Sequence, residues 1–385
     1  MKKQLALILL SLGIAFGPTH SLLAREISLK KVERCPVLSC LGIDDRLWGN
    51  QNDRQALLNS IEQSLKYLST PTAAKVYRDY PVPGFTLDRV RKSLVRFRQI
   101  LVNSKSSAQF YTAIEREFAV YQSVGRDGKG EVLFTGYYEP IYKASLYPTS
   151  EYRYPLYRKP ADFDNWSKPH PTRAQLEGYN GLLGRKSPLA GQELVWLRDR
   201  LEAYLVQVQG SARLELDSGQ TISVGYNGST DYPYVSIGRE MIKDGAISRK
   251  DLSLPKMIIY LQANPKLLHE YISRNDRLIF FKETNGAPAT GSINVPLTAD
   301  RSIATDKSLM PPGALALIRV HLPEFSPQGE LKTPLISRIV LDQDTGSAIK
   351  GAGRVDVFMG TGKKAGDRAG VTSNIGRLYY LLLKN

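Results

Sequence analysis

The hydrophobic pattern of this 385-residue chain changes near residue 130, and that change constrains the fold more than any other feature. Between residues 53 and 122 apolar side chains recur at helical spacing, which predicts packing helices, one of them with Thr86 as its N-cap. From Glu131 onward short strand-like runs are interrupted by Gly, Pro and Asn, with short helices around 236–244 and 255–273. A chain of this length is expected to form two domains that are mainly β, with helices on the N-terminal side.

Local spacing adds further structural expectations. The apolar series from Phe110 to Tyr121 predicts a helix that continues through Phe118. The alternation in Leu205-Val206-Gln207-Val208-Gln209 predicts a strand. Asp217-Ser218-Gly219-Gln220 predicts a hairpin turn.

Two aspartates near the C-terminus are the first candidates for chemistry. Asp344 opens a Gly-containing turn, and Asp356 lies between two valines in an alternating apolar strand. Burial and a neighbouring carboxylate both disfavour the charged form of a carboxyl group. A carboxyl group that is protonated near neutral pH can donate a proton to a glycosidic oxygen. The alternative is that Asp344 only makes the turn and Asp356 faces solvent.

A third aspartate and a series of short blocks give this pair a context. Asp306 precedes a Pro/Gly turn and a further strand. The blocks are Phe134-Thr135-Gly136-Tyr137-Tyr138-Glu139-Pro140, Tyr154-Pro155-Leu156-Tyr157, Gln207-Val208-Gln209-Gly210-Ser211, Gly225-Tyr226-Asn227-Gly228 with Tyr234-Val235-Ser236-Ile237-Gly238-Arg239-Glu240, Phe280-Phe281-Lys282-Glu283, and Val295-Pro296-Leu297-Thr298-Ala299-Asp300-Arg301-Ser302-Ile303-Ala304. In this order, and with the three aspartates, they resemble the membrane-bound lytic murein transglycosylase A family, which ends in a triple-aspartate (3D) module. The resemblance runs from about residue 130 to the end.

The resemblance implies a fold that the order of predicted elements along the chain does not reveal. Residues 1–24 would be a signal peptide, and 25–131 would form the helical N-terminal part of the first domain. Residues 132–284 would form an inserted second β domain, and 285–385 would complete a double-psi β-barrel with the first domain. A groove between the two domains would hold a glycan strand.

The resemblance also implies a reaction. Family members cleave the β-1,4 bond between N-acetylmuramic acid and N-acetylglucosamine without water and leave a 1,6-anhydromuramic acid end. Asp356 would be the general acid and then the general base, because it occupies the family's position in Gly-Arg-Val-Asp-Val-Phe. Asp344 and Asp306 are second choices, and a turn or cap role explains Asp306 equally well.

Seven residues are candidates for substrate binding. The aromatic ones could stack on sugars and the others could bond hydroxyl, acetamido or carboxylate groups; ordinary packing or solvated positions are the alternative. They are Tyr137, Tyr138, Gln207, Gln209, Ser211, Tyr226 and Arg239.

The charge of the chain restricts its partners. Lys and Arg total 52 against 37 Asp and Glu, a net charge of +15, which favours polyanions such as the cell wall. No nucleic-acid partner is expected, because the basic residues are scattered and no nucleic-acid-binding signature is present. No metal or other cofactor is expected, since two Cys and four His provide too few ligands and Gly360-Thr361-Gly362 lacks phosphate-loop spacing.

The N-terminus predicts export. Met1-Lys2-Lys3 precedes an apolar stretch that is too short to span a bilayer comfortably, and Ala24 offers a cleavage site. The chain is expected in the periplasm or cell envelope as a monomer, with peripheral or anchored association with the membrane left open. Cys35 and Cys40 predict a local disulfide in an exported chain.

Three alternative functions stay open at this point. An aspartic protease could use Asp344-Thr345-Gly346 with Asp217-Ser218-Gly219. A non-catalytic peptidoglycan-binding protein would result if Asp356 were tied into an ion pair with Arg354. A conventional hydrolase would use Asp344 and Asp356 and would produce reducing ends.

Overall fold

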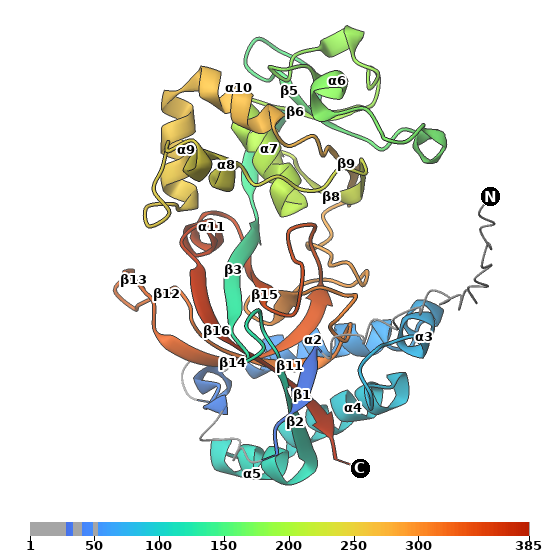
Figure 1. Ribbon diagram of the computed structural model, residues 1–385, viewed down its shortest axis with the longest axis vertical. Coiled ribbons are helices and arrows are strands. Elements are labelled where there is room, and N and C mark those ends of the chain that lie inside the picture. Colours follow the sequence, from blue (N-terminus) through green and yellow to red (C-terminus); the bar gives the residue numbers. More distant parts are fainter. Residues whose placement is uncertain (1–27, 34–40, 49–52, 385) are drawn as a thin grey trace, which may run out of the picture.

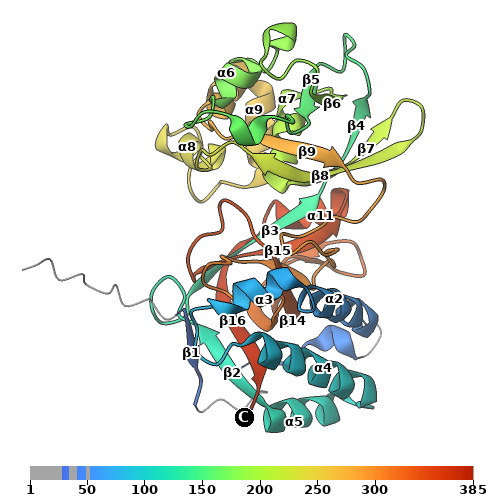
Figure 2. The ribbon, with the colours of Figure 1, turned by 90° about the vertical axis from the view of Figure 1, so that its right-hand side faces the viewer.

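The computed structural model describes residues 28–33, 41–48 and 53–384. Its elements form two lobes stacked along the long axis, and strand β3 (Val132–Glu139) passes from the lower lobe to the upper one (Figures 1 and 2). The predicted signal peptide and the Cys35–Cys40 disulfide lie outside the described residues.

A closed barrel forms the centre of the lower lobe. Strands β16, β11, β14, β10, β15 and β3 pair in this order, and β3 pairs with β16 to close the ring. The β10–β14 and β15–β3 pairs are parallel and the other pairs of the ring are antiparallel. The barrel strands besides β3 are β10 (Ser302–Ala304), β11 (Leu315–His321), β14 (Leu335–Asp344), β15 (Arg354–Thr361) and β16 (Ser373–Leu383). This ring and its mixed pairing are the predicted double-psi β-barrel.

The predicted N-terminal helices are present and cover the barrel. Thr70, Thr86 and Ser106 cap three of them by accepting a backbone N–H, so the predicted Thr86 cap is confirmed. Helix α2 packs on β14, where Ser60 and Gln343 are hydrogen bonded. The lower-lobe helices are α2 (Arg54–Tyr67), α3 (Pro71–Arg78), α4 (Leu87–Asn103), α5 (Ser107–Glu117) and α11 (Lys363–Ala369), with the short 3-10 helix η1 (Asp45–Leu47).

The helix predicted from the apolar series Phe110 to Tyr121 ends earlier than expected. Helix α5 stops at Glu117, and the continuation to Tyr121 is wrong, because the chain becomes strand β2 (Phe118–Ser123). β2 extends the barrel sheet: it pairs with β16 on one side and with β1 (Leu29–Lys31) on the other. Long-range pairing thus overrides a helical spacing that sequence alone favours. A small ribbon of β12 (Glu324–Phe325) and β13 (Leu331–Lys332) completes the lower lobe.

The upper lobe holds the second sheet. Its strand order is β5-β6-β4-β7-β8-β9, and Gly219 makes the predicted hairpin turn between β7 and β8. The strands are β4 (Ile141–Ser145), β5 (Tyr154–Tyr157), β6 (Glu193–Leu197), β7 (Ser211–Leu216), β8 (Thr221–Ser229) and β9 (Ile279–Glu283). The helices are α6 (Arg173–Glu177), α7 (Arg200–Gln209), α8 (Ile237–Lys243), α9 (Leu254–Ala263) and α10 (Pro265–Ser273), with 3-10 turns η2 (Phe163–Asn165) and η3 (Gly184–Lys186).

One predicted strand of the upper lobe is a helix. Residues 205–209 form the end of α7, which begins after the N-cap Asp199 and ends at Gly210 in a left-handed conformation. Val208 is exposed and Gln207 is buried, the reverse of what the predicted alternation required. The mainly β, two-domain fold class is confirmed. The exact domain boundaries stay a prediction, and β3, at the start of the predicted insert, pairs within the barrel.

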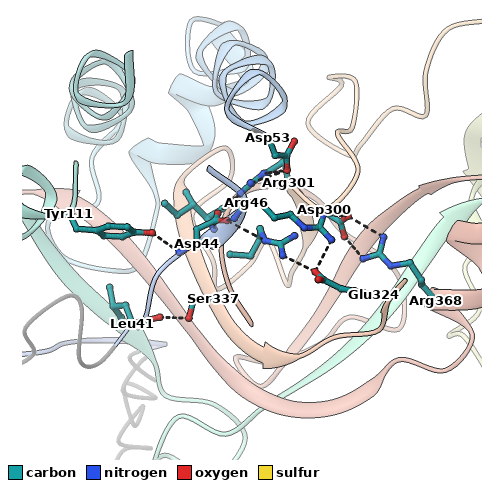
Figure 3. A network of polar contacts seen from close by, with 12 residues as sticks. Leu41, Asp44, Arg46, Asp53, Tyr111, Asp300, Arg301, Glu324, Ser337 and Arg368 are labelled. Carbon is teal, nitrogen blue, oxygen red and sulfur yellow. Dashed lines mark hydrogen bonds and ion pairs between the residues drawn. The ribbon is translucent and has the colours of Figure 1, made fainter. Parts of the chain in front are cut away.

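A buried ionic network fastens the segment after residue 41 to the barrel (Figure 3). Asp44 is fully buried, pairs with Arg301 and accepts from the Ile339 N–H. Arg46 pairs with Asp300 and Glu324 at 2.9 and 2.7 Å. The network therefore links the segment 41–48 to the loop that precedes β10.

Candidate active site

Strand β10 lies between the strands that carry the two candidate carboxylates. Ala304 pairs with Asp344 of β14 on one side and with Asp356 of β15 on the other. Directly paired residues point to the same face of a sheet, and neighbouring strands are about 4.8 Å apart. The barrel thus brings Asp344 and Asp356 to one face with a single strand between them.

Asp344 is held by three donors. Tyr137 donates its hydroxyl to Oδ2 at 2.8 Å, and the N–H groups of Ser292 and Thr345 donate to Oδ1 at 2.8 Å each. Burial raises the pKa of Asp344 above its ordinary value, although these hydrogen bonds act in the opposite direction. Both of its oxygens are therefore occupied.

Asp356 is held differently, by one oxygen. Its Oδ1 accepts from the Thr135 hydroxyl and from Nε of Arg354, the latter at 3.2 Å. Nη2 of Arg354 also donates to the Thr135 hydroxyl at 2.8 Å. The Asp356 side chain is 18% exposed and that of Arg354 is 20% exposed. The ion pair that the binding-protein alternative required is thus present, and Asp356 remains accessible.

Asp306 anchors a loop. It accepts from the N–H and the hydroxyl of Ser308 at 3.1 and 2.6 Å and from the N–H of Gly351 at 2.9 Å. Burial acts to raise the pKa of Asp306, but the hydrogen bonds from Ser308 and Gly351 outweigh it and lower that pKa. These contacts fit the turn or cap role considered for Asp306.

Of the two candidate tyrosines of β3, Tyr137 is partly buried and Tyr138 is buried. The Tyr137 ring lies on Phe358, with centroids 5.3 Å apart, and its hydroxyl reaches Asp344. Tyr138 is buried against Gly366 of α11, and its N–H donates to the side chain of Gln209 at 3.0 Å. In this structure Tyr137 supports Asp344, and Tyr138 packs against α11.

The other candidates divide by exposure. Gln207 is buried and accepts from Arg173 at 2.9 Å, and Ser211 starts β7 opposite Gly225. Tyr226 is 52% exposed. Arg239 is exposed in the first turn of α8. Tyr226 and Arg239 are therefore the candidates whose side chains are open to a ligand.

A buried carboxylate lies two residues before Asp344 on the same strand. Asp342 is fully buried and accepts from the Tyr380 hydroxyl at 2.6 Å, from Thr305 at 2.8 Å and from Lys307. Sequence reasoning did not single out Asp342, because its partners come from other parts of the chain.

A buried glutamate joins the lobes at the end of β3. Glu139 is 1% exposed and accepts from Arg213 of β7 at 2.9 Å and from Thr361 of β15 at 2.8 Å. Arg213 belongs to the upper lobe, whereas Thr361 ends the strand that carries Asp356. Glu139 therefore fixes the upper sheet relative to the candidate site.

Tyr234 brings the upper lobe near the candidate site. Burial raises the pKa of Tyr234, and the charge of Asp356 adds to that rise. The backbone beside it is held by Asn275, whose side chain accepts from the Val235 N–H at 3.1 Å. Sequence reasoning quoted Tyr234 within a block but assigned it no role.

The structure does not bring together the aspartates of the protease alternative. Asp217 lies at the end of β7 in the upper lobe, where it accepts from Tyr152 at 3.3 Å, while Asp344 ends β14 in the barrel. Among the described residues no group of His, Cys, Asp and Glu is placed to hold a metal ion. Nor does any helix in that part of the chain have the length and apolar character to cross a membrane.

Comparisons with known proteins match both halves of this arrangement. Residues 133–282 match the family described as the MltA specific insert domain, and residues 301–382 match the 3D domain. The membrane-bound lytic murein transglycosylase A of Escherichia coli strain K12 is 31% identical over 270 residues, which are 69% of this chain and 70% of that protein. The protein of the same name from Vibrio cholerae is 32% identical over 263 residues, 68% of each chain.

Solved structures show the same likeness. The crystal structure of a membrane-bound lytic murein transglycosylase from Agrobacterium tumefaciens gives a TM-score of 0.70 at 25% identity, covering 92% of this chain and 98% of that one. The crystal structure of E. coli MltA with bound chitohexaose gives a TM-score of 0.66 at 26% identity, covering 89% and 91%.

Proposed function

The chain belongs to the membrane-bound lytic murein transglycosylase A family and is a lytic transglycosylase that acts on peptidoglycan; we propose that Asp356 is its single general acid and base. The bond cleaved is the β-1,4 link between N-acetylmuramic acid and N-acetylglucosamine, and the product is a 1,6-anhydromuramic acid end.

The contacts of the two carboxylates support this assignment. Asp356 is partly exposed, and in the described part of the chain no hydrogen bond or ion pair reaches its Oδ2. Asp344 has donors on both oxygens. A general acid must come within hydrogen-bond reach of the atom that it protonates, and only Asp356 has an oxygen free to do so.

The proposed reaction needs one carboxyl group and no activated water. Asp356 gives its proton to the glycosidic oxygen as the C1–O bond breaks and positive charge develops at C1. The resulting carboxylate takes the proton from the muramoyl C6 hydroxyl, whose oxygen forms the new bond to C1. Asp356 is therefore protonated again at the end of each turnover.

The supporting residues have separate roles in this proposal. Asp344 and Tyr137 form a partly buried, hydrogen-bonded pair beside Asp356, and Asp306 keeps the adjacent loop in place. Tyr226 and Arg239 of the upper lobe are proposed glycan contacts, since both are exposed. A bound chitohexaose in the E. coli relative is consistent with a sugar chain as ligand.

The envelope is the proposed location. The curated relatives are membrane-bound proteins, and the net charge of +15 suits an anionic wall polymer. We propose a periplasmic, monomeric protein that associates with the membrane either peripherally or through its N-terminal segment.

A second candidate function rests on the ion pair of Asp356. Because Arg354 contacts the carboxylate, a protein that binds the glycan without cleaving it is the alternative. The two functions differ in whether soluble products form.

Mass spectrometry of soluble products from purified peptidoglycan tests the assignment. We expect anhydromuropeptides from the unchanged protein and none from Asp356→Asn, with both proteins folded. Asp367→Asn is the matched control, because Asp367 is a 42% exposed acid of α11 that pairs with Lys363, and it should remain active. Products from Asp356→Asn would refute the role of Asp356, and bound glycan without products from the unchanged protein would favour the binding function.

A further inference from the structure

Every contact that the structure gives the Asp356 carboxyl group ends on the same oxygen. Thr135 and Arg354 both donate to Oδ1, and in the described ranges nothing donates to Oδ2. We call Thr135 and Arg354 the Oδ1 clamp.

Strand pairing places the clamp. Thr135 is directly opposite Asp356 in the parallel pair of β3 and β15, and Arg354 is two residues earlier on β15. Both side chains therefore lie on the face of Asp356. Thr135 is β-branched, which restricts its side-chain rotamers.

The clamp fixes the direction of its own hydrogen bonds. The Thr135 hydroxyl accepts from Nη2 of Arg354 at 2.8 Å. A hydroxyl has one proton to donate, and that of Thr135 is directed to Oδ1 of Asp356. Arg354 has donors only, so it cannot accept a hydrogen bond from Thr135. The hydrogen bonds therefore run in one direction, from Arg354 to Thr135 and from Thr135 to Oδ1 of Asp356.

We propose that Thr135 and Arg354 are positioning residues that hold Asp356 by Oδ1 through both halves of the reaction and leave Oδ2 to carry the proton. This inference rests on the proposed role of Asp356. In the acid form Oδ1 is a carbonyl oxygen and in the base form it is a carboxylate oxygen, and both accept hydrogen bonds. The clamp therefore stays intact while Oδ2 gains and loses its proton, so the ion pair is compatible with catalysis.

Arg354 adds a charge to the positioning. A nearby cation favours the carboxylate that remains after the proton has left. The titratable groups near Asp356 are Arg354 on its own strand, Tyr137 on β3, Tyr234 from the upper lobe and Asp344 of β14, which lies beyond Ala304 of β10. Burial raises the pKa of both tyrosines, so they stay neutral at working pH, and Arg354 is the cation that contacts the carboxyl group.

The hydroxyl of the clamp is tested with paired variants of the full chain. Thr135→Val keeps the shape and removes the donor, and we expect kcat to fall about 10- to 100-fold with KM little changed, as for a displaced catalytic group. Thr135→Ser keeps the donor and should restore kcat to within about threefold of the unchanged protein. Equal kcat for Thr135→Val and the unchanged protein, or an equal loss in both variants, would overturn the proposal.

The Arg354 half of the clamp is tested by kcat and KM in the same assay. Arg354→Gln removes the guanidinium group that contacts both Thr135 and Asp356, and we expect kcat to fall about 10-fold with KM little changed. Equal kcat for Arg354→Gln and the unchanged protein would refute the part of Arg354 in the clamp. If the unchanged protein released no anhydro products, the proposed function itself would be refuted. That outcome is distinct from a failure of the clamp, in which the unchanged protein is active and the variants do not differ from it as expected.

Discussion

At the scale of residues, the site separates two carboxylates by the way each is held. Asp344 accepts hydrogen bonds on both oxygens, and Asp356 accepts them on one. Three donors suit a fixed group, and a free oxygen suits one that exchanges a proton. The chemistry is therefore assigned by contacts, because both residues are partly exposed aspartates on the two barrel strands that flank β10.

Tyr137→Phe tests how Asp344 is anchored. It removes the hydroxyl that donates to Asp344, and hydrogen bonds to charged groups contribute about 1.5–3 kcal/mol. We expect the free energy of unfolding to fall by about that amount. The loss should grow as pH rises, because the lost donor stabilised the carboxylate form of Asp344.

Urea unfolding at several pH values measures this effect. Tyr226→Phe is the control, since Tyr226 is exposed and its hydroxyl makes only a 3.4 Å contact with Ser229. Its unfolding free energy should change by no more than about 0.5 kcal/mol. Equal losses in the two variants at every pH would contradict the anchoring role of Tyr137.

Sequence reasoning found the aspartates but could not supply their partners. Asp306, Asp344 and Asp356 were recognised within motifs, and the turn role considered for Asp306 agrees with its contacts. Tyr137 was a candidate for sugar stacking, and the contact of its hydroxyl with Asp344, 207 positions away, could not be foreseen. Such contacts depend on β3 lying beside β15, which no local pattern encodes.

At the scale of elements, barrel closure depends on β16. This strand pairs with β2, β11 and β3, and Gly376 is the residue at which it meets both β11 and β3. A Cβ atom at Gly376 would lie 2.6 Å from Cβ of Val320 and 2.6 Å from the Arg319 carbonyl oxygen. The absence of a side chain there lets the closing strands approach.

Gly376→Ala is expected to destabilise the barrel. Overpacking of this kind costs about 1–3 kcal/mol, because backbone and Val320 must shift. Ile375→Ala is the control, since Ile375 is 44% exposed and its truncation leaves the closing contact intact. Urea unfolding compares the two, and a Gly376→Ala variant as stable as the unchanged protein would show that the closure tolerates a side chain.

The errors in element prediction have physical causes. In α7 the N-cap Asp199 and the left-handed Gly210 outweigh five residues of apparent alternation. In β2 the partner strand β16 captures residues whose spacing also suits a helix. Helices with clear caps, such as the one after Thr86, were predicted correctly because their signals are local.

At the scale of the whole molecule, buried charges hold distant segments of the chain together. Asp300 accepts two hydrogen bonds from Arg368 of α11 and one from Arg46 near the start of the described chain (Figure 3). Burial acts to raise the pKa of Asp300, but the hydrogen bond and charge of Arg368 and the charges of Arg46 and Arg338 outweigh it and lower that pKa to about 2. Asp300 also starts the loop into β10, the strand between the two carboxylates.

Asp300→Asn should weaken the fold in a pH-dependent way. A lowered folded-state pKa stabilises the protein above the ordinary value of 3.8 and loses that effect as pH falls through about 2. Removing one partner of a buried ion pair costs about 3–5 kcal/mol, so we expect a loss of this order at neutral pH and a smaller one near pH 2. Asp88→Asn, at a 60% exposed acid, should have little effect at any pH.

Urea unfolding between neutral pH and the acid limit checks this prediction. The difference in unfolding free energy between the unchanged protein and Asp300→Asn should become smaller as the pH is lowered. A difference that is the same at every pH would contradict the prediction. It would show that Asp300 stabilises the fold by packing and not by its charge interactions with Arg368 and Arg46.

The central claim concerns the whole enzyme: it cleaves peptidoglycan without adding water. The most direct test is digestion of purified peptidoglycan in water labelled with the heavy oxygen isotope, followed by mass spectrometry of the new saccharide ends. We predict ends that carry no label and are one water lighter than reducing ends. Labelled reducing ends would contradict the claim and would identify the enzyme as a hydrolase.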